Sequence, residues 1–124
     1  MPKVLVVDDN RPSRELIVDI LRPLSLEVAE APDGTTALAS ARDMKPDLVI
    51  LDLSMPDIDG FAVLNELRRD PDCARTPCLA VTANAMPGER SEALLAGFSE
   101  FLTKPVRSGE LRHRVEVLLN GSRP

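Results

Sequence analysis

Residues 47–52 read DLVILD, and this short run decides the fold. Its four consecutive apolar residues predict a β-strand buried on both faces, because a strand with one solvated face would alternate apolar and polar residues. Pro46 precedes the run and the turn-rich segment 54–60 (SMPDIDG) follows it, so the strand is bounded on both sides. The strand ends at Asp52, which places a carboxylate at the end of a buried strand.

Outward from this strand, short apolar runs alternate with segments in which apolar residues recur at helical spacing. The predicted strands cover residues 4–7, 27–31, 47–51, 78–81 and 98–102, and the predicted helices lie around residues 16–24, 37–41, 61–67, 87–97 and 111–119. Asn10 is expected to cap the first helix. Pro87 is expected to open the fourth helix, with Leu94 and Leu95 on its inner face, and Gly97 to end it.

This alternation of strands and helices predicts an α/β fold, with parallel strands and helices on both faces of the sheet. The chain has 124 residues, of which 44% are hydrophobic and 28% charged, as is typical of a globular protein. That length fits one domain, expected over residues 1–120, with a flexible polar tail at 121–124. The net charge of −5 argues against nucleic acid or an anionic membrane surface as a direct partner.

The longest apolar runs are only strand-sized, so no segment is expected to span a membrane, and the N-terminal residues lack a signal-peptide pattern. Cys73 and Cys78 are too few for a disulfide framework. Their C-x4-C spacing, with no histidine nearby, is not typical of a zinc site. We interpret them as thiols in a reducing compartment and expect a cytoplasmic protein.

Reactive or polar side chains stand at the ends of four of the five predicted strands: Asp8 and Asp9, Asp52, Thr82 and Lys104. In open parallel sheets ligands bind outside the carboxyl ends of the strands, where the strand order reverses. If the first and third strands are neighbours there, the three carboxylates converge on one small volume and require a counter-charge. An all-oxygen ligand set suits Mg²⁺ or Mn²⁺ rather than zinc.

Phosphoryl transfer is the chemistry that this residue set favours. Asp52 is the natural nucleophile, since a carboxylate can form an acyl phosphate, while Lys104 and Thr82 can neutralise and hydrogen-bond phosphoryl oxygens. Each residue alone also has an ordinary structural explanation, such as a helix cap, a loop start, a strand threonine or a solvated lysine. The joint pattern, in which four of the five predicted strands end in such residues, favours the functional interpretation.

From about Lys3 to Leu119 the chain resembles the receiver domains of two-component response regulators. The similarity rests on four motifs, which are Val7-Asp8-Asp9-Asn10, Asp52-Leu53-Ser54-Met55-Pro56 followed by Asp59-Gly60, Thr82-Ala83, and Lys104-Pro105. The resemblance implies a flavodoxin-like, doubly wound, five-stranded parallel sheet of order 2-1-3-4-5 with five helices.

The resemblance also implies roles for individual residues. Asp52 would receive its phosphoryl group from a phosphohistidine on a sensor histidine kinase or a histidine phosphotransfer domain. Asp9 would bind Mg²⁺ directly and Asp8 directly or through water. Asp52 and the backbone carbonyl of Ser54 would complete the protein ligands, and Mn²⁺ could replace Mg²⁺.

By the same resemblance, a conformational switch would link Thr82 to an aromatic residue on the fifth strand, here Phe101. The family often has tyrosine at that position, and phenylalanine lacks its hydroxyl group. An ordinary core aromatic remains the alternative for Phe101. Ser54 and Asn84 would flank the path of the water that hydrolyses the acyl phosphate, and both are polar.

Two functions remain open from the sequence. The first is a signalling switch that catalyses only its own phosphorylation and dephosphorylation, as a monomer or a weak, phosphorylation-dependent homodimer. Its downstream protein target would bind the face formed by the fourth helix, fifth strand and last helix, where Met86, Val106 and Arg107 are candidates for exposed contacts. The second is a Mg²⁺-dependent phosphohydrolase with an aspartyl nucleophile. Such enzymes commonly carry a second aspartate two residues after the nucleophile, where this chain has Ser54.

Overall fold

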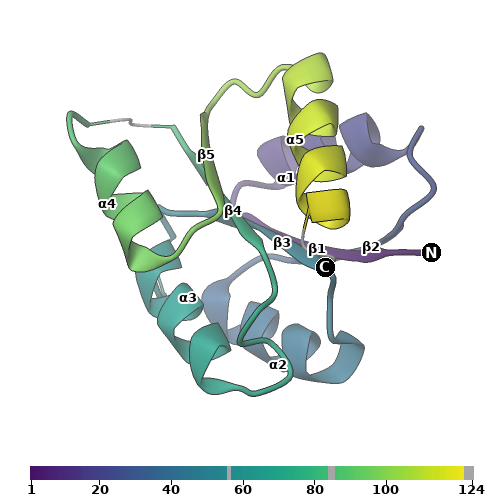
Figure 1. Cartoon of the computed structure of the whole chain (residues 1–124). Coiled ribbons are helices and arrows are strands. Elements are labelled where there is room, and N and C mark those ends of the chain that lie inside the picture. The colour runs from purple at the N-terminus through teal and green to yellow at the C-terminus, as the bar shows by residue number, and fades with distance from the viewer. Residues whose placement is uncertain (56, 84–85, 122–124) are drawn as a thin grey trace.

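A single parallel sheet forms the centre of the molecule. The computed structural model describes residues 1–55, 57–83 and 86–121, and its strands are β1 (Lys3–Val7), β2 (Glu27–Ala31), β3 (Leu48–Asp52), β4 (Cys78–Thr82) and β5 (Glu100–Thr103). All neighbouring strands pair in parallel, in the order β2-β1-β3-β4-β5 (Figure 1). The predicted sheet order is therefore confirmed.

Helices cover both faces of this sheet, as predicted. They are α1 (Arg11–Leu21), α2 (Gly34–Met44), α3 (Gly60–Arg69), α4 (Glu89–Ala96) and α5 (Ser108–Gly121). Figure 1 shows α1 and α5 on one face and α2, α3 and α4 on the other. Across the described ranges, none of the helices has the length and apolar character that a membrane crossing requires.

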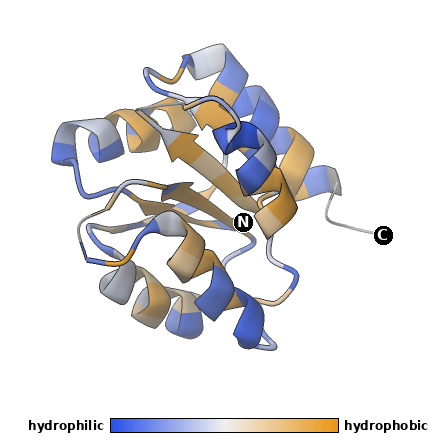
Figure 2. Cartoon of the chain, turned by 90° about the vertical axis from the view of Figure 1, so that its left-hand side faces the viewer, coloured by the Kyte–Doolittle hydropathy of each residue, from blue (hydrophilic) through white to orange (hydrophobic). Residues whose placement is uncertain are grey.

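Two apolar clusters lie on the two faces of the sheet, because successive strand residues point to opposite sides. Val4 and Val6 of β1 pack in the cluster under α1 and α5, whereas Leu5 and Val7 pack in the cluster under α2, α3 and α4. Every residue of β3 is buried, as the run at 47–52 predicted. Figure 2 shows apolar residues on the strands and polar residues on the outer surfaces of the helices.

Side-chain caps fix the starts of three helices at the carboxyl edge of the sheet. Asn10 Oδ1 accepts a hydrogen bond from Ser13 N at 2.9 Å, as predicted. Asp33 and Asp59 cap α2 and α3 in the same way, at 2.7 and 2.9 Å. Each cap satisfies a helix N–H that would otherwise lack a partner and stabilises its helix by about 1 kcal/mol. The caps thereby define where the loops that carry the strand-end residues stop.

The fourth helix differs from its prediction. It begins at Glu89 rather than Pro87, because Gly88 has φ of +86° and cannot belong to a right-handed helix. Leu94 and Leu95 are 40% and 88% exposed, so their predicted place on the inner face is wrong. The small Ala93 is instead the buried residue of this short helix. Gly97, with φ of +116°, ends the helix as predicted.

Val106 is also placed differently from its prediction as an exposed contact. It is only 9% exposed and packs in the apolar cluster under α1 and α5, which removes it from the outer surface. Met86 is 66% exposed and Arg107 is exposed, so both remain available at the surface. The expected tail at 121–124 lies outside the described residues, except for Gly121, the last residue of α5.

Candidate phosphoacceptor and metal site

Three carboxylates gather at the carboxyl edge of the sheet. Asp52 is the last residue of β3, and Asp8 and Asp9 directly follow β1, its hydrogen-bonded neighbour, in which Val7 pairs with Leu51. One carboxylate oxygen from each aspartate lies within 4.8 Å of the others. Asp8 is fully buried, Asp52 is 4% exposed and Asp9 is exposed. The cluster is therefore buried on the side of Asp8 and accessible to solvent on the side of Asp9.

Lys104 reaches this cluster from the loop after β5. Its Nζ lies 2.9 Å from Asp8 Oδ2 and 3.4 Å from Asp52 Oδ2. Its backbone N–H donates to Thr82 O at 2.8 Å, which fastens the loop to the end of β4. Since β4 lies between β3 and β5, the long side chain must extend over the end of β4 to meet the two carboxylates.

Burial raises the pKa of Asp52 to about 6, and the neighbouring charge of Asp8 adds to that rise. The Ser54 N–H, which donates to Asp52 Oδ1 at 3.0 Å, and the Lys104 ammonium oppose it. For Asp8, burial also acts upward, but contacts with Lys104, Ser13 and the Asn10 N–H outweigh it and lower its pKa. As the pH rises, Asp8 therefore ionises before Asp52.

The residues present fit a hard divalent cation. When all three aspartates are ionised, the one ammonium group of Lys104 leaves two negative charges unbalanced. Asp8 Oδ2 is buried, and its contact with Lys104 is an ion pair rather than a well-aligned hydrogen bond, so the oxygen retains capacity to bind a metal. The donors are all carboxylate oxygens, which Mg²⁺ and Mn²⁺ prefer.

Thr82 and Phe101 occupy one face of the sheet. Phe101 pairs with Ala80 in the β4–β5 register, and Thr82 is two residues beyond Ala80, so Thr82 and Phe101 point to the same side. Phe101 is 5% exposed and its ring packs in the cluster under α2, α3 and α4. The aromatic ring is therefore in an inward position. Of the two residues expected to influence hydrolysis, Ser54 is exposed beside Asp52, and Asn84 lies outside the described residues.

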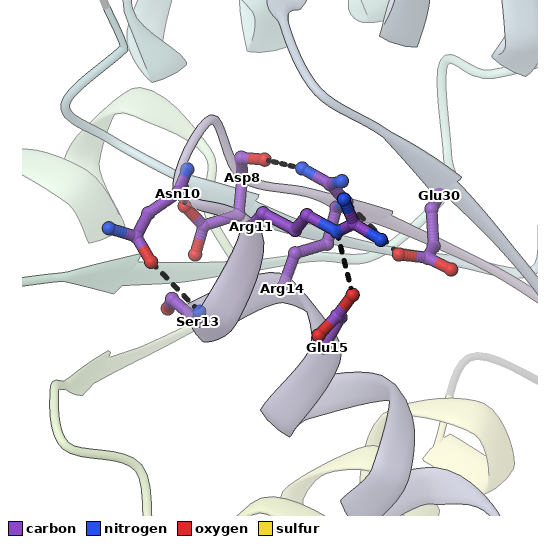
Figure 3. A network of polar contacts seen from close by, with 7 residues as sticks. All are labelled: Asp8, Asn10, Arg11, Ser13, Arg14, Glu15 and Glu30. Atoms are coloured by element: carbon purple, nitrogen blue, oxygen red, sulfur yellow. Dashed lines mark hydrogen bonds and ion pairs between the residues drawn. The ribbon is translucent and has the colours of Figure 1, made fainter.

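Sequence reasoning missed the contacts of two residues, Arg14 and Asp57. Arg14 of α1 donates to the Asp8 carbonyl at 2.8 Å (Figure 3). Asp57, in the loop after β3, accepts hydrogen bonds from Gly34 N and Thr35 N at the start of α2, each at 3.2 Å. Both contacts join separate elements, and no short motif signals them.

Comparisons with known proteins agree on one family. A family model described as the response regulator receiver domain matches residues 4–116. The chain is 36% identical over 119 residues to the DNA-binding dual master transcriptional regulator RpaA of Synechocystis sp., covering 96% of this chain and 49% of that protein. It is 40% identical over 116 residues to the response regulator PleD of Caulobacter vibrioides, and the match covers 94% of this chain and 26% of PleD. The chain thus spans about half or less of the length of these relatives.

A solved structure provides a similar match. The receiver domain of a sensor histidine kinase from Pseudomonas aeruginosa has a TM-score of 0.87 and 32% identity, covering 96% of this chain and 98% of that one. That domain was solved with a magnesium ion coordinated in its active-site cleft.

Proposed function

The chain belongs to the response regulator receiver domains, and from this membership we propose that Asp52 is the residue on which it accepts a phosphoryl group. Receiver domains take phosphoryl groups from histidine kinases and act in signalling. The observation that carries the assignment is the gathering of Asp8, Asp9, Asp52 and Lys104 at one edge of the sheet.

In the proposed reaction, an Asp52 carboxylate oxygen attacks the phosphorus of a phosphohistidine donor. A P–O bond forms, the P–N bond breaks, and its electron pair returns to the imidazole. A pKa of about 6 leaves the Asp52 carboxylate about nine-tenths ionised at pH 7, as the attack requires. Lys104 already contacts Asp52 Oδ2, so its ammonium group can follow the transferred phosphoryl oxygens as charge accumulates there.

Asp8, Asp9 and Asp52, with the backbone carbonyl of Ser54, are the residues proposed to hold Mg²⁺ or Mn²⁺. The bound ion would neutralise charge on the phosphoryl oxygens. The carboxylates would position the ion, and the exposure of Asp9 and Ser54 leaves that side open to solvent and to a donor. Ser54 and Asn84 are proposed to flank the path of the hydrolytic water, and both would allow polar contacts with it.

Phosphorylation is proposed to switch a partner-binding face. The new phosphoryl oxygens would attract Lys104 and the Thr82 hydroxyl, and Phe101, on the same side of the sheet as Thr82, would repack in response. The affected surface comprises α4, β5 and α5, with exposed Met86 and Arg107 as candidate contacts for a downstream protein or a weak homodimer. RpaA is a DNA-binding protein, but the net charge of −5 favours a protein target for this chain.

The phosphoryl donor is proposed to be a sensor histidine kinase or a histidine phosphotransfer domain. A mostly apolar groove of about 400 Å³ continues from the site and is lined by Pro12, Ser13, Leu16, Lys104, Pro105 and Val106. Lys104 belongs both to the groove and to the carboxylate cluster, so a donor seated there would present its phosphohistidine close to Asp52. A cytoplasmic location is part of the proposal, supported by the free thiols of Cys73 and Cys78.

The number of catalytic turnovers distinguishes a signalling switch from the alternative, a general phosphohydrolase. We propose that the chain catalyses only its own phosphorylation and dephosphorylation, because Ser54 stands where such hydrolases commonly have an acid for the leaving group. Incubation with acetyl phosphate and Mg²⁺ should add one phosphoryl group per chain, and Asp52→Asn should abolish the addition. Many turnovers on unrelated phosphomonoesters, or an unchanged adduct in Asp52→Asn, would contradict the proposal.

A further inference from the structure

The guanidinium group of Arg14 lies between the end of β1 and β2 (Figure 3). Its side chain is only 14% exposed. One nitrogen, Nη1, donates to the Asp8 carbonyl at 2.8 Å, and another, Nε, pairs with Glu30 Oε1 of β2 at 3.0 Å. An arginine with two such contacts is a rigid hydrogen-bond donor, because its guanidinium group is planar and the positions of its N–H groups are fixed relative to one another.

This contact fixes the main chain from which Asp9 projects. The Asp8 N–H donates to Ala31 O at 3.2 Å, so Asp8 is held through its N–H and, by Arg14, through its C=O. The carbonyl of Asp8 and the nitrogen of Asp9 share one planar peptide unit, and fixing the carbonyl therefore orients the start of Asp9. Within the described residues, the exposed Asp9 carboxylate has no hydrogen bond or ion pair of its own to orient it.

We propose that Arg14 is a positioning residue for the metal site: by holding the Asp8–Asp9 peptide, it keeps the Asp9 carboxylate turned toward Asp8 and Asp52. The inference rests on the proposed function, in which these carboxylates hold Mg²⁺. Direct electrostatics act in the opposite direction, because a fixed positive charge beside a cation site weakens cation binding. The two effects predict opposite signs for the removal of Arg14, which makes the proposal testable.

Arg11 provides a matched control on the same helix. It carries the same charge near the start of α1 and pairs with Glu15 Oε1 at 2.8 Å, but its side chain is 79% exposed (Figure 3). Its guanidinium bonds to Glu15 and makes no hydrogen bond to Asp8. Arg11→Met and Arg14→Met therefore remove the same charge and keep similar apolar stems, but only Arg14→Met releases the peptide.

The test measures Mg²⁺ affinity by titrating the metal-free protein and following backbone amide resonances, with unfolding free energies measured in parallel. We expect Arg14→Met to weaken Mg²⁺ binding about tenfold, the size typical of residues that orient metal ligands. Arg11→Met should bind Mg²⁺ as tightly as the wild type or slightly more tightly. Arg14→Lys should recover part of the loss, since its ammonium group can still donate to the Asp8 carbonyl.

In metal-free Arg14→Met, the Asp8 carbonyl resonance should shift and the Asp9 amide should become more mobile. If Arg14→Met does not fold, Glu30→Gln tests the same anchor, with Glu15→Gln as its control, and should weaken Mg²⁺ binding more than that control. The positioning role would be overturned if Arg14→Met bound Mg²⁺ as tightly as the wild type, or if the two variants of each matched pair changed Mg²⁺ affinity equally. Either result would leave the proposed function standing. A wild-type protein that does not bind Mg²⁺ would instead overturn the proposed function.

Discussion

Lys104 Nζ and Asp8 Oδ2 lie 2.9 Å apart, although they follow β5 and β1, which are separated in the sheet by β3 and β4. This pair places a positive charge in a cluster that a divalent cation can also neutralise. Contact with the carboxylates outweighs the effect of burial and raises the pKa of Lys104, so the lysine stays charged. In the metal-free protein Lys104 is therefore the internal counter-ion of the site.

Removing that counter-ion should destabilise the metal-free protein. We expect Lys104→Met to lower the unfolding free energy at pH 7 by about 1–3 kcal/mol, because it leaves two buried carboxylates unpaired. Mg²⁺ should restore much of the loss by supplying the missing charge. Urea denaturation with and without Mg²⁺ measures both effects. The control, Lys45→Met, removes an exposed pair with Asp72, and equal losses in the two variants would contradict this role.

The raised pKa of Asp52 predicts a pH-dependent gain in stability for Asp52→Asn. Between the ordinary value of 3.8 and about 6, the native state binds the Asp52 proton more tightly than the unfolded state, so ionisation destabilises the fold as pH rises. At pH 7 without metal, Asp52→Asn should therefore gain up to about 3 kcal/mol, and below pH 3.8 it should gain little. Mg²⁺ should stabilise the wild type more than the variant. A gain independent of pH would argue against this origin.

The apolar groove beside Lys104 predicts a difference between protein and small-molecule donors. Leu16 is 47% exposed in this groove, and Leu16→Asp would place a charge in it. We expect at least tenfold slower phosphotransfer from a phosphorylated histidine phosphotransfer domain and an unchanged rate with acetyl phosphate. Leu95→Asp, on 88% exposed Leu95 of α4, should alter neither rate. Equal slowing with both donors would show that Leu16 supports the site itself rather than the donor.

Gly60 is required by the packing of the loop after β3. A Cβ there would lie 2.8 Å from Leu53 Cα, which is closer than side-chain carbons approach, and 3.0 Å from the Asp52 carbonyl oxygen, which is an unusually tight contact. We expect Gly60→Ala to cost about 1–3 kcal/mol of unfolding free energy and to weaken Mg²⁺ binding by displacing the loop. Gly109→Ala, in α5 with nothing within 4 Å, is the control and should be neutral or stabilising by up to about 1 kcal/mol. Similar losses in both variants would contradict the steric account.

Burial on both faces explains why the sheet could be predicted from the sequence. Strands such as β3 are covered on both sides, so they consist of a run of apolar residues. The strands that contribute to the site have a polar residue directly after this run, which marks the site in the sequence. The short α4 carried no comparable signal, because its buried residue is the small Ala93 and its leucines are exposed.

The supporting contacts could not be predicted, because they depend on how separate elements meet in space. Arg14 reads as an ordinary polar position of an amphipathic helix, and its partners are Asp8, which follows β1, and Glu30 of β2. Asp57 reads as a turn residue, yet its carboxylate is fixed by the start of α2. Val106 follows a proline in a loop, and it is buried because it packs in the cluster that residues of the sheet, α1 and α5 form together.

The most direct measurement is to locate the phosphoryl group after incubation with acetyl phosphate and Mg²⁺. Borohydride reduces an aspartyl phosphate to homoserine, which marks the acceptor for peptide mass spectrometry. The account predicts homoserine at position 52 alone, and none when Mg²⁺ is omitted. Homoserine at position 8 or 9, or labelling that persists without a divalent cation, would contradict it.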